Sequence, residues 1–226
     1  MLTKRIKFLA EVKKFHGLRE MLLTLWTGII HLNSKRFILI ALTTPRTMEK
    51  ALKSSNRHDF HFATPNELQK LKDDGSYEIA DIDIYRVKHN ISRCMVQMDG
   101  DKCTGYAWVW NNTVAYIDDG LYLNLPENTI YNYKAYTDSE YRGLGFQGLR
   151  HLKLLKLLKK EGITQLFGFV DHLNTKSLYG VKKSGYRKVG ELLIKHKKGK
   201  AQATYKLNDD FWTGKPAAVD SNMNLL

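Results

Sequence analysis

The segment from Tyr136 to Gly148 holds the residues whose types and spacing are best suited to chemistry. It reads Tyr-Thr-Asp-Ser-Glu-Tyr-Arg-Gly-Leu-Gly-Phe-Gln-Gly, and an apolar stretch with helical periodicity follows it. Its glycines allow several backbone N–H groups to converge on one point, and the helix that follows adds the positive end of its dipole. The segment therefore predicts a cradle for a phosphorylated ligand.

Two common phosphate-binding sequences do not fit this turn. No Gly-Lys-Ser or Gly-Lys-Thr follows, as a P-loop requires, and the dinucleotide-binding pattern lacks its preceding parallel strand unit. A structural interpretation also stays open, in which the glycines only permit a sharp turn from strand to helix.

The elements that position this turn follow from hydrophobic periodicity. Before it, a series of strand-like segments predicts an antiparallel meander over residues 79–137, formed by 79–87, 93–98, 103–110, 114–123 and 129–137. A helix is expected to start at Thr64 and run to about residue 72, with Glu67 completing a capping box. After the turn we expect a helix over 146–160, a buried strand over 165–170, a helix over 174–183, and a terminal hairpin of 186–195 with 201–207.

The first residues suggest a separate element. Apolar residues recur every three or four positions between Lys4 and Ile30, among many basic residues, which is typical of an amphipathic helix. Packing on its own domain or on a second subunit is the favoured interpretation. Peripheral contact with an anionic membrane surface is the alternative.

Composition limits the class of protein. The 226 residues are 43% hydrophobic, with four prolines, and predict one globular domain. Cys94 and Cys103 are too few for a disulfide framework, so we expect reduced thiols and a cytoplasmic protein. No apolar run is long enough for a transmembrane segment. The eight histidines lack the spacing of metal ligands, so we expect no metal.

The net charge of +13 is unevenly distributed along the chain. Residues 1–57 hold 12 basic and 3 acidic residues, and residues 58–141 hold 7 basic and 14 acidic ones. Residues 142–206, which begin at the glycine turn, hold 16 basic and 3 acidic residues. This division favours an anionic ligand at the later segment and, more weakly, a cationic one at the middle segment, although solvated charged surfaces would give the same counts.

The order of these features resembles the GNAT acetyltransferase superfamily over residues 60–207. The resemblance rests on Arg142-Gly143-Leu144-Gly145 before a helix, on Asn174 and Ser177 after a strand, and on Gly185-Tyr186 before the last hairpin. It implies an α/β (α+β) fold with a mixed, mostly antiparallel twisted sheet, splayed central parallel strands and flanking helices. We therefore expect a basic helical extension over 1–57, an acyltransferase domain over 58–207 and a loose tail over 208–226.

The resemblance also implies which residues contact acetyl-coenzyme A, the expected donor. Main-chain amides of the turn would bind its diphosphate, and Asn174 and Ser177 would lie along its pantetheine arm. Gln147 stands where the family has a small residue, so we expect the binding or the angle of the donor to differ there from the family pattern. The full expected set is Thr137, Arg142, Gly143, Leu144, Gly145, Phe146, Gln147, Gly148, Asn174 and Ser177.

Candidates for proton transfer are weaker. Asp118 and Asp119 end a strand and are candidate general bases. Asp138 and Glu140, near the glycine turn, are weaker candidates. Many family members carry a tyrosine acid seven residues after the asparagine, but that position is Val181 here. Tyr179 lies two residues earlier, on a different helix face, and is a weak candidate acid.

The leading interpretation is an N-acetyltransferase that transfers an acetyl group from acetyl-coenzyme A to a primary amine, such as an amino sugar, a polyamine or a lysine. Two alternatives stay open. One is a non-catalytic module that binds nucleic acid or an anionic surface through its basic residues. The other is a related transferase that takes aminoacyl groups from tRNA.

Overall fold

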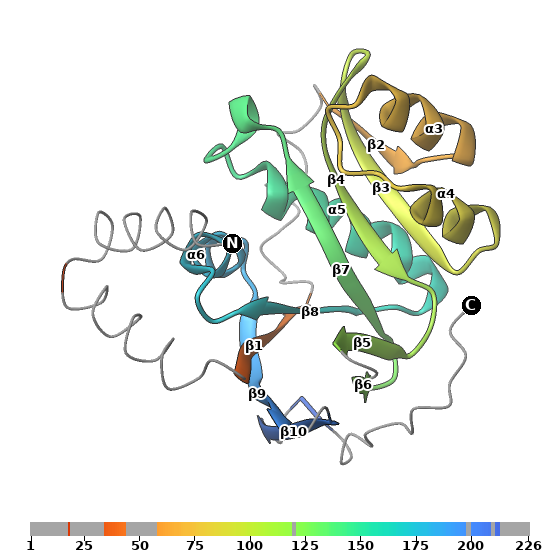
Figure 1. Cartoon of the computed structure of the whole chain (residues 1–226). Coiled ribbons are helices and arrows are strands. Elements are labelled where there is room, and N and C mark those ends of the chain that lie inside the picture. The colour runs from red at the N-terminus through yellow and green to blue at the C-terminus, as the bar shows by residue number, and fades with distance from the viewer. Residues whose placement is uncertain are drawn as a thin grey trace.

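An eight-stranded sheet forms the centre of the computed structural model (Figure 1). The structure describes residues 18, 34–43, 58–118, 121–197, 200–208 and 211–212. The strand order is β10-β9-β1-β8-β7-β4-β3-β2. The strands are β1 (Ser34–Thr43), β2 (Asp59–Phe62), β3 (Ser92–Asp99), β4 (Lys102–Trp110), β7 (Thr129–Thr137), β8 (Gln165–Asp171), β9 (Arg187–Lys197) and β10 (Lys200–Leu207).

The sheet is antiparallel except at its centre, where β7 and β8 are parallel. Their pairing covers three positions and ends at Tyr131 with Phe167. Beyond this pair, β7 continues against β4 and β8 continues against β1, but the two strands no longer pair with each other. The expected mixed sheet with splayed central parallel strands is confirmed.

Helices and a small hairpin cover the two faces of the sheet. The helix α5 (Phe146–Leu158) packs through Leu154, Leu155 and Leu158 on the face that carries Ile130 and Leu166. Side chains alternate along a strand, so Tyr131 and Phe167 lie on the opposite face. There they pack with a separate two-stranded sheet, β5 (Val114–Asp118) and β6 (Leu121–Asn124).

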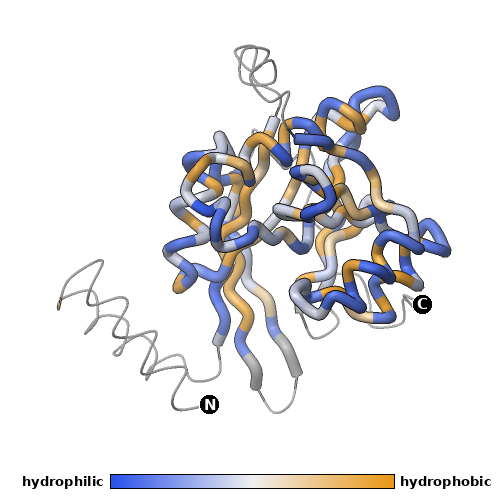
Figure 2. Tube along the Cα trace, turned by 90° about the horizontal axis from the view of Figure 1, so that it is seen from above, coloured by the Kyte–Doolittle hydropathy of each residue, from blue (hydrophilic) through white to orange (hydrophobic). Residues whose placement is uncertain are grey.

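The helices α3 (Pro65–Asp74) and α4 (Asp81–Lys88) lie on the face opposite α5, over β3 and β4 (Figure 1). The last helix is α6 (Thr175–Lys183), and short 3-10 turns cover Ser139–Tyr141 (η2) and Lys159–Glu161 (η3). In Figure 2 hydrophobic residues lie along the strands, while hydrophobic and hydrophilic residues alternate along the helices. This is expected for a sheet core covered by amphipathic helices. The expected capping box of α3 is present, because Glu67 N donates to Thr64 Oγ1 and Thr64 N donates to Glu67 Oε2.

The prediction of a strand over 79–87 was wrong, because most of this segment forms α4. Its apolar residues at 79, 82, 84, 85 and 87 alternate only imperfectly. The first turn carries acidic residues and the last turn basic ones, which suits the helix dipole. Asp83 caps the start by accepting a hydrogen bond from Ala80 N. The expected meander also differs at 114–123, which contributes the separate β5–β6 hairpin.

Residues 34–43, which we expected within a helical extension, form β1 inside the sheet. The strand pairs with β8 on one side and β9 on the other, and Leu39, Ala41 and Leu42 are fully buried. A strand that is buried on both faces carries no alternation of apolar and polar residues, so the period-2 signal is absent. The amphipathic stretch from Lys4 to Ile30 lies, apart from Leu18, outside the described residues.

The C-terminal segment also contributes to the core. Phe211 and Trp212 are buried beside Phe167, and the Trp212 indole N–H donates to Val189 O at 3.0 Å. These two residues belong to the segment that we expected to be a loose tail.

Within the described residues, no helix is long and apolar enough to span a membrane.

Candidate functional site

The predicted phosphate cradle lies where β7 leads into α5. After η2, Gly143 and Gly145 adopt left-handed φ angles of 81° and 82°, and Gly145 is the N-cap of α5. Left-handed backbone favours glycine, because other residues are strained there. The first N–H groups of a helix lack intrahelical partners, and Gly145 has no side chain to cap them. The N-terminus of α5 therefore offers backbone donors to an anion.

The outer side of the turn is open. A methyl group at the α-carbon of Gly143 or Gly145 would have no heavy atom of the described residues within 4 Å. Leu144 between them is 66% exposed. The turn is therefore accessible to a ligand that approaches from outside the protein.

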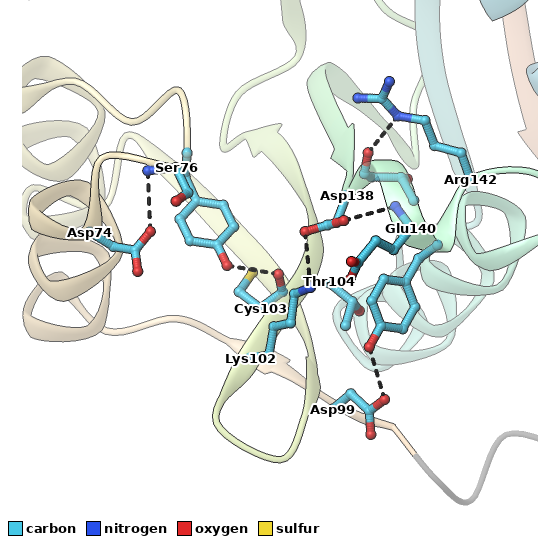
Figure 3. Close-up of polar contacts among 12 residues, drawn as sticks. Asp74, Ser76, Asp99, Lys102, Cys103, Thr104, Asp138, Glu140 and Arg142 are labelled. Carbon is cyan, nitrogen blue, oxygen red and sulfur yellow. Dashed lines mark hydrogen bonds and ion pairs between the residues drawn. The ribbon is translucent and has the colours of Figure 1, made fainter.

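A group of side chains fixes the entrance to the turn (Figure 3). Asp138 Oδ1 accepts from Glu140 N at 2.9 Å, and Asp138 N donates to Thr104 O at 3.0 Å. Lys102 Nζ from β4 lies 2.6 Å from Glu140 Oε2 and 3.5 Å from Asp138 Oδ2. Its hydrogen bond with Glu140 raises the pKa of Lys102 to about 12. These contacts tie the turn to the β3–β4 hairpin.

The expected arginine is at the end of β7. Arg142 Nε donates to Thr137 O at 2.9 Å, which places the exposed guanidinium beside the last residue of the strand (Figure 3). Thr137 and Arg142 from the expected set are thus brought together, and Phe146 begins the helix directly after the glycines.

Gln147 and Gly148 face α6. Gln147 Oε1 lies 3.3 Å from the position that a Cβ of Gly180 would occupy, so the longer side chain is directed toward α6. A Cβ on Gly148 would lie 3.0 Å from Ser184 Oγ. Glycine at 148 therefore permits the close approach of α5 to the end of α6.

Asn174 and Ser177 lie beyond the open end of β8. Asn174 is the N-cap of α6, and its Oδ1 accepts from Ser177 N at 3.0 Å. The strand ends at Asp171, so both residues follow the strand that diverges from β7. The side-chain amide N–H₂ of Asn174 is not used in this cap.

The candidates for proton transfer are only partly described. Asp118 ends β5 in the hairpin that packs against Tyr131 and Phe167, but its side chain and the whole of Asp119 lie outside the described residues. Tyr179 is on α6 and is 70% exposed. Both assignments stay predictions.

Sequence reasoning missed a buried arginine beneath the turn. Arg150 on α5 is completely buried, and its Nη2 donates to Tyr136 O at 2.6 Å and to Thr137 Oγ1 at 2.8 Å. Its Nη1 donates to Gln97 Oε1 at 3.0 Å. Burial lowers the pKa of Arg150 to about 10, so it stays charged at neutral pH. A signal was available, because Arg150 lies within the apolar pattern of the helix.

A second buried polar pair was also missed. The Tyr186 hydroxyl lies 3.0 Å from His151 Nδ1, and both side chains are buried. Burial lowers the pKa of His151 to about 3, with the charge of Arg150 as a further cause, so the imidazole is neutral. Burial also raises the pKa of Tyr186. The pair links α5 to the start of β9.

Comparisons with known proteins identify similar solved structures only. No family model matches the chain, and no curated protein matches it. An aminoglycoside acetyltransferase from an uncultured soil metagenomic sample, in complex with trehalose, is 14% identical with a TM-score of 0.43, covering 57% of this chain and 88% of its own. A GCN5-related N-acetyltransferase-like protein from Streptococcus suis is 16% identical with a TM-score of 0.47, covering 81% of this chain and 66% of its own. The PaiA N-acetyltransferase from Thermoplasma acidophilum, in complex with coenzyme A, is 14% identical with a TM-score of 0.42, covering 67% and 99%.

Proposed function

We propose that this chain, whose sheet has the arrangement expected of the GNAT superfamily, is an N-acyltransferase that uses acetyl-coenzyme A as donor. One observation carries the proposal: two parallel strands separate after Tyr131 and Phe167, and the glycine turn stands at the end of one of them. The three similar solved structures named above have TM-scores below 0.5, so the proposal rests on this chain's own geometry.

The turn suits the diphosphate of the donor. Coenzyme A carries about four negative charges on its phosphates at neutral pH. The backbone amides of residues 143–148 and the N-terminal end of α5 would bind the diphosphate, with the Arg142 guanidinium beside it. Residues 142–206, with 16 basic and 3 acidic residues, extend from this point.

The separated strands suit the pantetheine arm. Past Tyr131 and Phe167, the edges of β7 and β8 that face each other are no longer paired with each other. Backbone groups on these edges are therefore available to the two amides of the arm. The register of β7 against β4 also shifts between Lys134 and Asn132, which makes Tyr133 a bulge residue. Its N–H is our candidate donor to the thioester oxygen.

The reaction requires few groups. The amine nitrogen attacks the thioester carbonyl, a C–N bond forms, the C–S bond breaks, a base accepts a proton from the amine and the thiolate takes up a proton. We propose that Asp118 or Asp119 is the base, because the β5–β6 hairpin packs against Tyr131 and Phe167, on the face opposite α5. Tyr179 is retained as the candidate acid.

The acceptor that we propose is a primary amine with positive charge, such as an amino sugar, a polyamine or a lysine side chain. Residues 58–141, which include the β5–β6 hairpin, hold 14 acidic and 7 basic residues. A negative surface potential there would attract such an acceptor.

The test measures thiol release from acetyl-coenzyme A with three acceptors: an aminoglycoside, spermidine and a lysine peptide. We expect acceptor-dependent release with at least one of them, and mass spectrometry should show one added acetyl group on that amine. Saturable binding of acetyl-coenzyme A should accompany it. If the donor neither binds nor stabilises the protein at millimolar concentration, the proposed function is wrong.

A further inference from the structure

Arg150 is a buried cation without an acidic partner among the described residues. It forms none of the ion pairs found there, and its Nε has no hydrogen-bond partner. The groups that act most strongly on its charge are Cys103, Cys94 and Tyr106, and burial raises the pKa of each, so all three are neutral at pH 7. A buried charge without an opposite charge is unfavourable.

The position of Arg150 in α5 adds to this imbalance. It lies in the second turn of a helix whose N-terminus already carries the positive end of the dipole. Two sources of positive potential therefore coincide at this end of the helix. An anion at the turn would be attracted by both.

The surrounding residues hold the guanidinium in place. Gly105 on β4 leaves space for the Arg150 guanidinium, because a Cβ at residue 105 would lie 2.2 Å from Arg150 Nη1. Two of its hydrogen bonds go to Tyr136 O and Thr137 Oγ1, at the end of β7. Arg142 holds Thr137 O from the outer side. The strand end from which the turn starts is thus held by one exposed and one buried arginine.

We propose that Arg150 is a positioning residue for the diphosphate of the donor: its buried charge strengthens anion binding at the turn, and its guanidinium fixes the end of β7. This inference rests on the proposed function. According to this inference, a buried residue contributes to the recognition of the donor's phosphates. Arg150 does not need to contact the ligand directly.

The experiment compares two donors that differ in their phosphates. Acetyl-coenzyme A carries the diphosphate, and S-acetylpantetheine does not. Dissociation constants are determined from ligand-dependent thermal unfolding of the wild type and of Arg150→Met. We expect Arg150→Met to weaken acetyl-coenzyme A about tenfold and S-acetylpantetheine less than about twofold, because only the first ligand is anionic. Arg150→Lys, which keeps the charge, should recover most of the difference.

Arg93→Met is the matched control, because it removes the same charge from β3, where Arg93 pairs with Glu161. It should leave both dissociation constants unchanged. If Arg150→Met does not fold, Arg150→Gln replaces it with the same expected ratio. An equal change for both ligands would mean that Arg150 only supports the fold, and no change for either would also overturn the inference. If the wild type binds neither ligand, both the proposed function and this inference are wrong.

Discussion

At the scale of single residues, Gly145 has two separate roles in the turn. Its φ angle of 82° is one that side chains rarely adopt, and its α-carbon is open to solvent. A substitution there would therefore strain the backbone and place a side chain directly over the N-terminus of α5.

We predict that Gly145→Val abolishes stabilisation by acetyl-coenzyme A while the protein still folds. The strain should lower the free energy of unfolding by about 1–2 kcal/mol, and the valine methyl groups should block the backbone donors. Thermal unfolding with and without the donor measures both effects.

Gly75 provides the matched control. It follows α3 and has a φ angle of 75°, and a Cβ added there would have no heavy atom of the described residues within 4 Å, apart from its chain neighbours. Gly75→Val should show similar strain but keep the full response to the donor. A normal response in Gly145→Val would remove Gly145 from the site.

His151 predicts a dependence of stability on pH. Its pKa is lowered to about 3 in the folded protein, whereas the unfolded chain titrates near 6.5. Between these values the unfolded state binds one more proton, so stability falls as the pH decreases below about 6.5. The slope that this residue contributes is at most about 1.4 kcal/mol per pH unit.

The variant His151→Gln isolates this contribution, since glutamine does not titrate. Denaturant unfolding between pH 6.5 and 4.5 should show a shallower loss of stability in the variant. His61 is present in both proteins, so its contribution cancels in the comparison. Its carboxylate neighbours raise its pKa, so its contribution to the pH dependence of stability lies at higher pH than that of His151. Equal slopes would show that His151 is protonated in the folded state.

At the scale of elements, the contact between α5 and α6 determines how the turn and Asn174 face each other. Gly148 permits this contact, because a Cβ there would lie 3.0 Å from Ser184 Oγ and 3.1 Å from Ser184 Cβ. A larger residue at 148 would require Ser184 to shift by a few tenths of an ångström.

We predict that Gly148→Ala lowers the free energy of unfolding by about 1–3 kcal/mol through overpacking. Ser184→Gly should relieve the effect, because it removes both crowded atoms. A double-mutant cycle measures the coupling. Additive effects of the two substitutions would contradict a direct clash.

Elements with strong local signals were predicted well, and elements defined by tertiary context were not. Thr64, Pro65 and Glu67 form a complete local start signal for α3. By contrast, the apolar residues of 79–87 are compatible with either a strand or a helix, and packing on β3 and β4 decides for α4. The strand β1 lacks alternation because both of its faces are buried, and its neighbours in the sheet come from residues far along the chain, so no local pattern reveals it.

The site shows the same division. The glycine turn and Asn174 could be proposed from the sequence because each is defined by a few consecutive residues, and the structure places both at helix N-termini. Arg150 depends on Gln97, Gly105 and Tyr136 from three strands, and no local pattern brings these together. The pairing of His151 with Tyr186 likewise spans 35 positions.

At the scale of the whole molecule, the sheet places the two halves of the proposed reaction on opposite sides. The glycine turn and Arg150 belong to the side covered by α5, and the β5–β6 hairpin packs against the other face at Tyr131 and Phe167. Between the two sides, β7 and β8 no longer pair with each other beyond Tyr131 and Phe167. A donor with a long, narrow arm between its phosphates and its thioester fits this arrangement.

A crystal structure with acetyl-coenzyme A tests this account most directly. It predicts the diphosphate within hydrogen-bond distance of the backbone N–H groups of residues 143–148, and the pantetheine arm between β7 and β8 beyond Tyr131 and Phe167. A donor bound elsewhere, or a turn that stays empty at saturating donor concentration, would contradict it.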